Sequence, residues 1–208
     1  MSLLHQGMLE VGDYAFENCE QLRKVDLGSK VRRIGVLAFK SCVAFRSFTV
    51  PAGVTEVEYG VFWGCRNLEE IVLPDHIGRI GANAFLDCEA LERICIPKTV
   101  ESIGDKAFAN CQKLAEITIP AAVREIGDAA FAGSCVLRKM EVEEGNLCFD
   151  SREDCNAIIR IESNTLVAGL FPLPFHAFRR QVHPAAAVIQ NDRIGRDDRL
   201  FPIKFPVY

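Results

Sequence analysis

Apolar and polar positions repeat along this chain with a period of 23 residues. The most regular marker, called the landmark phenylalanine below, recurs without drift as Phe16, Phe39, Phe62, Phe85, Phe108 and Phe131. A fixed period of roughly 20–50 residues is typical of stacked repeats, and 23 residues falls within the leucine-rich-repeat range. The pattern therefore predicts a repeat solenoid of about six coils, one for each landmark phenylalanine.

Within each copy the apolar positions predict a strand that ends at a proline. In the most regular copy, Leu91, Ile94 and Ile96 form a Leu-x-x-Ile-x-Ile pattern, and the Ile-x-Ile pair alternates as a half-buried strand does. Pro97 follows and ends the strand, since proline has no N–H to donate to a ladder. Gly104 then permits a turn into the next piece of the coil.

After this turn the pattern indicates a short helix. An aspartate follows the glycine in three copies, as Asp13, Asp105 and Asp128, and we expect it to cap a helix that carries the Ala-Phe-x-x-Cys motif. One coil buries roughly six apolar side chains worth about 1.5–3 kcal/mol each, whereas ordering its backbone costs about 1–2 kcal/mol per residue. Stability must therefore come from stacking. Stacking predicts one continuous parallel β-sheet on the concave face, and short helices and turns on the other side.

The full repeat resembles one known family. Its pattern, Leu-x-x-Ile-x-Ile-Pro-x-x-Val-x-x-Ile-Gly-x-x-Ala-Phe-x-x-Cys, is similar to that of the BspA-like (Treponema pallidum-type) leucine-rich repeats, over about residues 4–142. A second stretch, residues 150–169, resembles the degenerate repeat found between regular coils of that family. The resemblance implies a leucine-rich-repeat solenoid of α/β-like character.

The pattern divides the chain into three parts. Residues 1–142 form the solenoid of 23-residue coils, residues 143–170 a degenerate repeat with a β-hairpin, and residues 171–208 an off-pattern, Pro-rich tail. The tail holds six Lys/Arg against three Asp, a net charge of +3, and the rest holds 18 against 25, a net charge of −7. The tail is either a cap on the acidic body or an extension foreign to the family's pattern. As a cap it would cover the open end with apolar side chains: Leu200, Phe201, Ile203, Phe205 and Val207.

Composition narrows the classes of partner. The net charge of −4 argues against nucleic acid, and no run of about 18 apolar residues is present to insert into a membrane. The first residues have no basic segment followed by a long apolar one, so they do not form a secretory signal. These first residues already follow the 23-residue repeat, because Leu4 aligns with Leu27. We expect either that the chain is a fragment of a longer protein or that its open N-terminal end packs against another molecule, which includes a second copy of the chain.

Five of the nine cysteines share one column of the repeat: Cys19, Cys42, Cys65, Cys88 and Cys111. A buried column of this kind is a packing choice, because free cysteine behaves as a small hydrophobe. Cys135 comes one residue late, which we interpret as Gly133 and Ser134 padding the last coil. No Cys-x-x-Cys pair or histidine partner indicates a metal site. Cys95 differs, since its outward strand position predicts a solvent-exposed thiol.

Outward strand positions would line the concave face, where solenoids commonly bind. Acidic residues, among them Glu70 and Glu92, hold its centre, and basic residues flank them. This favours a groove for an extended, partly basic protein; the alternative is a solvated face without a partner. The candidate residues are Arg46, Thr49, Glu69, Val72, Arg93, Cys95, Glu116 and Thr118.

A second candidate surface lies on the predicted helix side. The third coil departs from the pattern at Tyr59 and Trp63, which with Leu86 and the preceding Val36 and Leu37 would form an exposed apolar patch. Such patches often mark interaction sites. The alternative is that Trp63 folds over the edge of its coil to fill space.

The sequence carries no catalytic signature. The four histidines are scattered, and no Ser-His-Asp order, Gly-rich phosphate loop or His-Glu-x-x-His motif is present. We therefore expect no enzyme and no cofactor. The family resemblance implies a surface or secreted protein that mediates adhesion to proteins of a host or neighbouring cell. The alternative is an intracellular scaffold that recruits a protein through the concave face, where reduced cysteines are usual.

Overall fold

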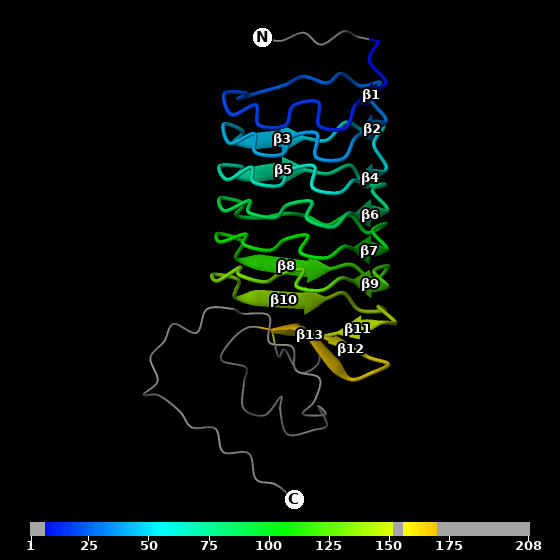
Figure 1. Cartoon of the computed structure of the whole chain (residues 1–208). Coiled ribbons are helices and arrows are strands. Elements are labelled where there is room, and N and C mark those ends of the chain that lie inside the picture. Colours follow the sequence, from blue (N-terminus) through cyan, green and yellow to red (C-terminus); the bar gives the residue numbers. More distant parts are fainter. Residues whose placement is uncertain (1–6, 152–155, 170–208) are drawn as a thin grey trace, which may run out of the picture.

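The computed structural model describes residues 7–151 and 156–169, so the predicted tail of residues 171–208 lies outside the described residues. The described chain forms a column of stacked coils (Figure 1). We number the coils 1 to 6 by their landmark phenylalanines, from Phe16 to Phe131, and count the strand segment that follows each phenylalanine as part of the same coil. The predicted solenoid with 23-residue spacing and parallel strands is confirmed.

The predicted strand segment forms one row of strands on the column. It contains β3 (Ser47–Thr49), β5 (Glu70–Val72), β8 (Glu116–Ile119) and β10 (Lys139–Val142). β3 pairs with β5 and β8 with β10, both in parallel. The row is not the continuous sheet that we expected, because coil 4 joins it only through an isolated bridge between Glu70 and Arg93. Ile94 beside this bridge is half-buried, whereas its equivalents Ile71 and Ile117 are buried.

The structure has a second row of strands that the sequence did not predict. It lies at another side of the column (Figure 1) and has two residues per coil. β1 and β2 pair in parallel, and β4, β6, β7 and β9 form a parallel four-stranded sheet in that order. Two residues are too few for an alternating pattern to be recognised as a strand. The strands are β1 (Glu10–Val11), β2 (Arg33–Ile34), β4 (Glu56–Val57), β6 (Arg79–Ile80), β7 (Ser102–Ile103) and β9 (Glu125–Ile126).

The predicted short helices are wrong: residues 7–151 and 156–169 contain turns in their place. In every coil the residues two before and two after the landmark phenylalanine have positive φ, as do Lys106 (53°) and Asn110 (58°) around Phe108. A residue in the left-handed region cannot continue a right-handed helix. The Ala-Phe-x-x-Cys motif therefore folds as two tight turns around its phenylalanine.

Alternate N–H groups of these turns bond within the coil and to the next coil. Phe108 N donates to Ala130 O of coil 6 at 2.7 Å, and Ala109 N donates to Lys106 O of its own turn at 3.1 Å. Two of the aspartates predicted as helix caps, Asp13 and Asp105, serve the same stacking. The carboxylate of Asp105 accepts from the N–H of Asp128, one coil later, at 2.8 Å.

The core is a stack of the landmark phenylalanines. Phe85 is fully buried, and its ring lies parallel to those of Phe62 and Phe108, with centroids 5.5 and 5.3 Å away. The cysteine column runs beside the stack, and each buried thiol donates to the phenylalanine carbonyl of the preceding coil, as Cys88 does to Phe62 O at 3.1 Å. The motif thus fills the core and also links the coils.

The padding that we inferred in coil 6 is wrong. Ser134 stands in the cysteine column, where it is buried and its hydroxyl donates to Phe108 O at 3.0 Å. It lies three residues after Phe131, as Cys111 does after Phe108, so no residue is inserted. Cys135 lies outside the column and is exposed.

An antiparallel sheet follows coil 6, with β12 (Ala157–Arg160) between β11 (Phe149–Asp150) and β13 (Thr165–Gly169). Asn146 connects it to the solenoid. Its buried amide donates to Pro120 O and Val123 O at 2.9 and 3.0 Å and accepts from the N–H groups of Cys148 and Phe149 at 2.8 Å. The Asn146 side chain thus forms hydrogen bonds with backbone groups that would otherwise bond to another coil.

Candidate interaction surfaces

The eight residues proposed for the concave face lie together on the outward side of the first strand row, which we call the strand face. Alternation along each strand puts them there, since Phe48 points into the core while Ser47 and Thr49 are exposed. Glu69 is half-buried, and the other seven are exposed: Arg46, Thr49, Val72, Arg93, Cys95, Glu116 and Thr118.

Three acidic residues of the strand face form ion pairs with cations of neighbouring coils. Arg46 forms an ion pair with Glu69, and Arg138 lies 3.5 Å from Glu116. Lys113 lies 3.9 Å from Glu92. Exposed pairs of this kind contribute about 0–1 kcal/mol each, but they reduce the negative potential of the face. Charge alone therefore does not select a basic partner.

An uncharged strip runs along the strand face beside these pairs. Thr49 and Val72 are neighbours in the ladder, and Cys95 and Thr118 hold the same position in coils 4 and 5. Val72 is 50% exposed, and the predicted exposure of Cys95 is confirmed. Next to the strip is an open depression of about 490 Å³, lined by Glu92, Arg93, Lys113, Ala115, Glu116, Val136 and Arg138.

Trp63 on the turn side is held between polar partners. Its indole N–H donates to Asp87 at 3.1 Å, and the ammonium group of Lys40 lies 5.1 Å from the ring centroid. Tyr59 also has a polar partner, since its hydroxyl accepts from Asn83 at 2.9 Å. Leu86 is half-buried in the next coil. The three proposed patch residues are therefore part of a mixed surface rather than a continuous apolar one.

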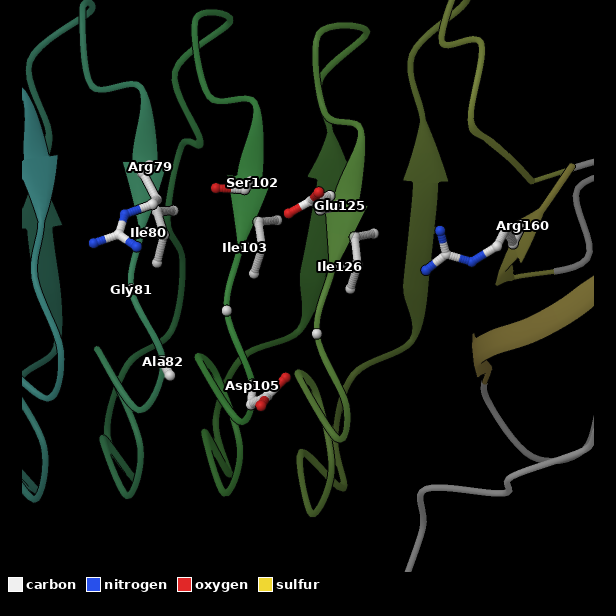
Figure 2. Close-up of a pocket in the computed structure, with 12 residues that line it drawn as sticks. Arg79, Ile80, Gly81, Ala82, Ser102, Ile103, Asp105, Glu125, Ile126 and Arg160 are labelled. Carbon is white, nitrogen blue, oxygen red and sulfur yellow. The ribbon is translucent and has the colours of Figure 1, made fainter. Parts of the chain in front are cut away.

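A third surface, a groove of about 530 Å³, was not found from the sequence. It crosses β6, β7 and β9, with Arg79 and Arg160 at opposite ends and Ser102 and Glu125 between them (Figure 2). The groove is open because small residues line it: Gly81, Ala82, Gly104 and Gly127. In earlier coils the larger residues Val36 and Tyr59 occupy the position equivalent to Ala82. Arg79 is already paired with Glu56 at 3.1 Å.

The buried cysteines are neutral thiols. Burial raises the pKa of the Cys42 thiol to about 12, and it raises the pKa of Cys88 well above the ordinary value. A neutral thiol is neither a nucleophile nor a metal ligand. Within residues 7–151 and 156–169, no group of three or more His, Cys, Asp or Glu side chains is arranged to hold a metal ion. The same part of the chain has no helix that could cross a membrane.

Parallel strand rows, 23-residue coils and a stacked phenylalanine column define a leucine-rich-repeat protein of the β-solenoid type. The model of the BspA-type leucine-rich repeat region matches residues 6–159 in six copies, so the chain belongs to this family. The family expected from the repeat pattern is thereby confirmed.

Solved structures of bacterial leucine-rich repeat proteins share the fold. A leucine-rich cell surface protein from Faecalibacterium prausnitzii is 25% identical with a TM-score of 0.67, over 78% of this chain and 42% of that one. The T. pallidum leucine-rich repeat protein is 28% identical with a TM-score of 0.50, over 56% and 64%. A Bacteroides ovatus protein is 28% identical with a TM-score of 0.53, over 66% and 42%. The chain thus spans between 42% and 64% of these proteins. No curated protein matches it.

Proposed function

We propose that this chain is a non-enzymatic protein-binding module of a cell-surface or secreted adhesion-type protein, and that it binds through the strand face. The observation that carries the proposal is the strand face itself: outward side chains of coils 2 to 6 lie on one exposed surface beside an uncharged strip. The likeness to the F. prausnitzii cell surface protein supports the location.

Val72 and Arg93 are the proposed centre of binding. Val72 is 50% exposed and offers apolar area. Arg93 lies opposite Glu70, two residues from Val72 along the strand, and has no ion pair among the described residues, whereas Arg46 and Arg138 are paired. Arginine is enriched at the residues that dominate binding energy. The partner that fits is an extended polypeptide segment that brings a carboxylate to Arg93 and an apolar side chain to Val72.

Two substitutions test the surface. The chain is used to capture a partner from native cell-surface extract, and the affinity of that purified partner is then measured for each variant. We expect Arg93→Glu and Val72→Asp to weaken binding about tenfold or more, because both lie at the proposed centre. Arg124→Glu, an exposed change of the same charge off the strand face, is the matched control. Equal loss in all three variants, or loss in none, would exclude the strand face.

The alternative function is an intracellular scaffold, and one observation favours it. The eight cysteines in the described part of the chain are free, which suits a reducing compartment. Protease treatment of intact native cells separates the two functions. Loss of an epitope in this chain places it outside the cell, and protection until lysis places it inside and rejects the adhesion function.

A further inference from the structure

The groove that crosses β6, β7 and β9 has a row of outward side chains along its floor. Arg79 is the ladder partner of Ser102, and Ser102 is the ladder partner of Glu125, both in parallel. Neighbours in this row are therefore about 4.8 Å apart along the column. Figure 2 shows the three residues in line, with Arg160 of β12 at the far end of the groove. The groove thus presents charged and polar groups in a fixed order.

Most of these polar groups have no polar partner in the described part of the chain. Only Arg79 has one, since its Nε donates to Glu56 at 3.1 Å. Within residues 7–151 and 156–169, the hydroxyl of Ser102, the carboxylate of Glu125 and the guanidinium of Arg160 make no hydrogen bond or ion pair. Three side chains of different chemistry therefore line one open groove with their bonding capacity unused.

The guanidinium of Arg160 is held in place without being neutralised. It lies over the ring of Phe149, 5.0 Å from the ring centroid, and Phe149 is the buried partner of Arg160 in the antiparallel pair of β11 and β12. The aromatic face leaves the N–H groups of the guanidinium available, and a guanidinium can offer two parallel N–H groups to one carboxylate. Because this side chain is already ordered, less conformational entropy is lost on binding. Arg160 is therefore the anion-binding end of the groove.

Glu125 selects against a ligand that has only anionic groups. Its carboxylate lines the same groove as Arg160 and is not paired with a cation of the described chain. Asp105 adds a second carboxylate, one oxygen of which accepts from the N–H of Asp128 at 2.8 Å. These carboxylates would repel a second anion, whereas an ammonium or guanidinium group would form a charge-assisted hydrogen bond. The groove therefore fits a ligand that carries both signs of charge.

We propose that this groove is a second binding site, separate from the strand face, for a partner's polypeptide segment that carries one acidic and one basic side chain. The acidic side chain pairs with Arg160, the basic side chain pairs with Glu125, and the hydroxyl of Ser102 bonds to the main chain beyond Glu125. The isoleucines of the groove, Ile80, Ile103 and Ile126, are buried in the core, so binding depends on charge. Exposed charge pairs of this kind are screened by salt.

Titration of the full chain with three sets of synthetic peptides, followed by NMR at the amides of Gly104 and Gly127, tests this site. The peptides are glycine chains that carry an aspartate and a lysine, two aspartates or two lysines, each pair separated by one to four glycines. At low salt we expect the best aspartate–lysine peptide to bind about tenfold more tightly than any peptide of the other two sets. High salt should remove this preference, because it screens exposed charges.

Charge reversal in the groove should change which peptide is preferred. Glu125→Arg leaves only arginines at this end of the groove, so the peptides with two aspartates should become the tightest ligands, by about tenfold. Arg160→Gln should weaken the aspartate–lysine peptide by a similar factor. Glu10→Arg is the matched control, because Glu10 is exposed at the equivalent position of β1, outside the groove, and should change nothing. Arg93→Glu on the strand face should also have no effect, which separates this site from the proposed function.

Four results would overturn the proposal. Equal binding of the three peptide sets would show that the groove does not select by charge. An unchanged preference in Glu125→Arg would exclude Glu125 from the site. Loss of peptide binding in Arg93→Glu would move the peptide to the strand face. Tighter binding of an oligosaccharide of glucuronate and N-acetylglucosamine than of any peptide would assign the groove to an acidic saccharide.

Discussion

Removing the ring of Phe85 tests whether stacking of the landmark phenylalanines stabilises the solenoid. The ring is fully buried, and it lies within 9° of parallel to both Phe62 and Phe108. Substitution of a buried phenylalanine by alanine costs about 3–5 kcal/mol, because transfer energy is lost and a cavity remains. Each aromatic pair adds about 0.5–1.5 kcal/mol, and Phe85→Ala removes two pairs. We therefore expect a loss in the upper half of that range.

Phe16→Ala gives the internal comparison. Phe16 is half-buried in the first described coil and stacks on Phe39 alone, at 5.2 Å. With about half the apolar area to lose, it should cost about 1–2 kcal/mol. Phe85→Leu keeps most of the volume without a ring, and it should fall between the two alanine variants.

Urea denaturation of the full chain, followed by circular dichroism, measures these free energies of unfolding by linear extrapolation. The order of cost should be Phe85→Ala, then Phe85→Leu, then Phe16→Ala. If Phe85→Ala cost no more than Phe16→Ala, stacking from both sides would not be the source of stability, and the reasoning would be refuted.

Three further predictions concern single side chains. Asn146→Ala should lower the free energy of unfolding by about 3 kcal/mol or more in urea titrations, since it removes four hydrogen bonds to backbone groups. The exposed Asn67→Ala, which removes one, should cost about 1 kcal/mol, and equal costs would show that the bonds of Asn146 do not stabilise the end of the solenoid. Burial raises the pKa of the Cys42 thiol from 9.0 to about 12, so its neutral form stabilises the fold fully below pH 9 and the contribution is lost as pH rises toward 12. Urea titrations between pH 8 and 11 should show a smaller loss of stability in Cys42→Ser, and an identical loss would contradict this. Trp63→Ala should lower the free energy of unfolding by about 1–2 kcal/mol, because Lys40 and Asp87 lose their contacts with the indole ring. If the variant instead kept its stability but no longer bound the partner protein, the turn side would be a binding surface.

The repeat could be predicted from the sequence because, in a stack of similar coils, each core side chain packs against the equivalent side chain of the next coil. The 23-residue spacing of Phe85 and Phe108 alone implied ring on ring, and the structure has that arrangement. The alternation around Phe48 likewise predicted which side chains are exposed on the strand face. The binding role of that face stays a prediction, because the structure shows only that its residues lie on one surface.

The turns were mispredicted because helix signals are local and the deciding contacts are not. A glycine, an aspartate and Ala-Phe-x-x-Cys together indicated a capped helix, yet Lys106 and Asn110 adopt positive φ. Asparagine tolerates this region, but lysine rarely adopts it. Hydrogen bonds to the next coil offset the cost of this backbone conformation, since the N–H groups of both residues donate to that coil. Asp105 changes its role for the same reason, from a helix cap to a link with Asp128.

The sequence by itself determined the number of coils, their register and the residues of the core, because a strict period fixes which side chains stack. Only the tertiary structure decided how the hydrogen bonds of the backbone between core positions are made: by the second row of strands, the left-handed turns, the buried Ser134 and the side chain of Asn146. These features depend on hydrogen bonds between residues about one coil apart in sequence. Such partners are invisible to any local pattern, and they become neighbours only once the coils are stacked.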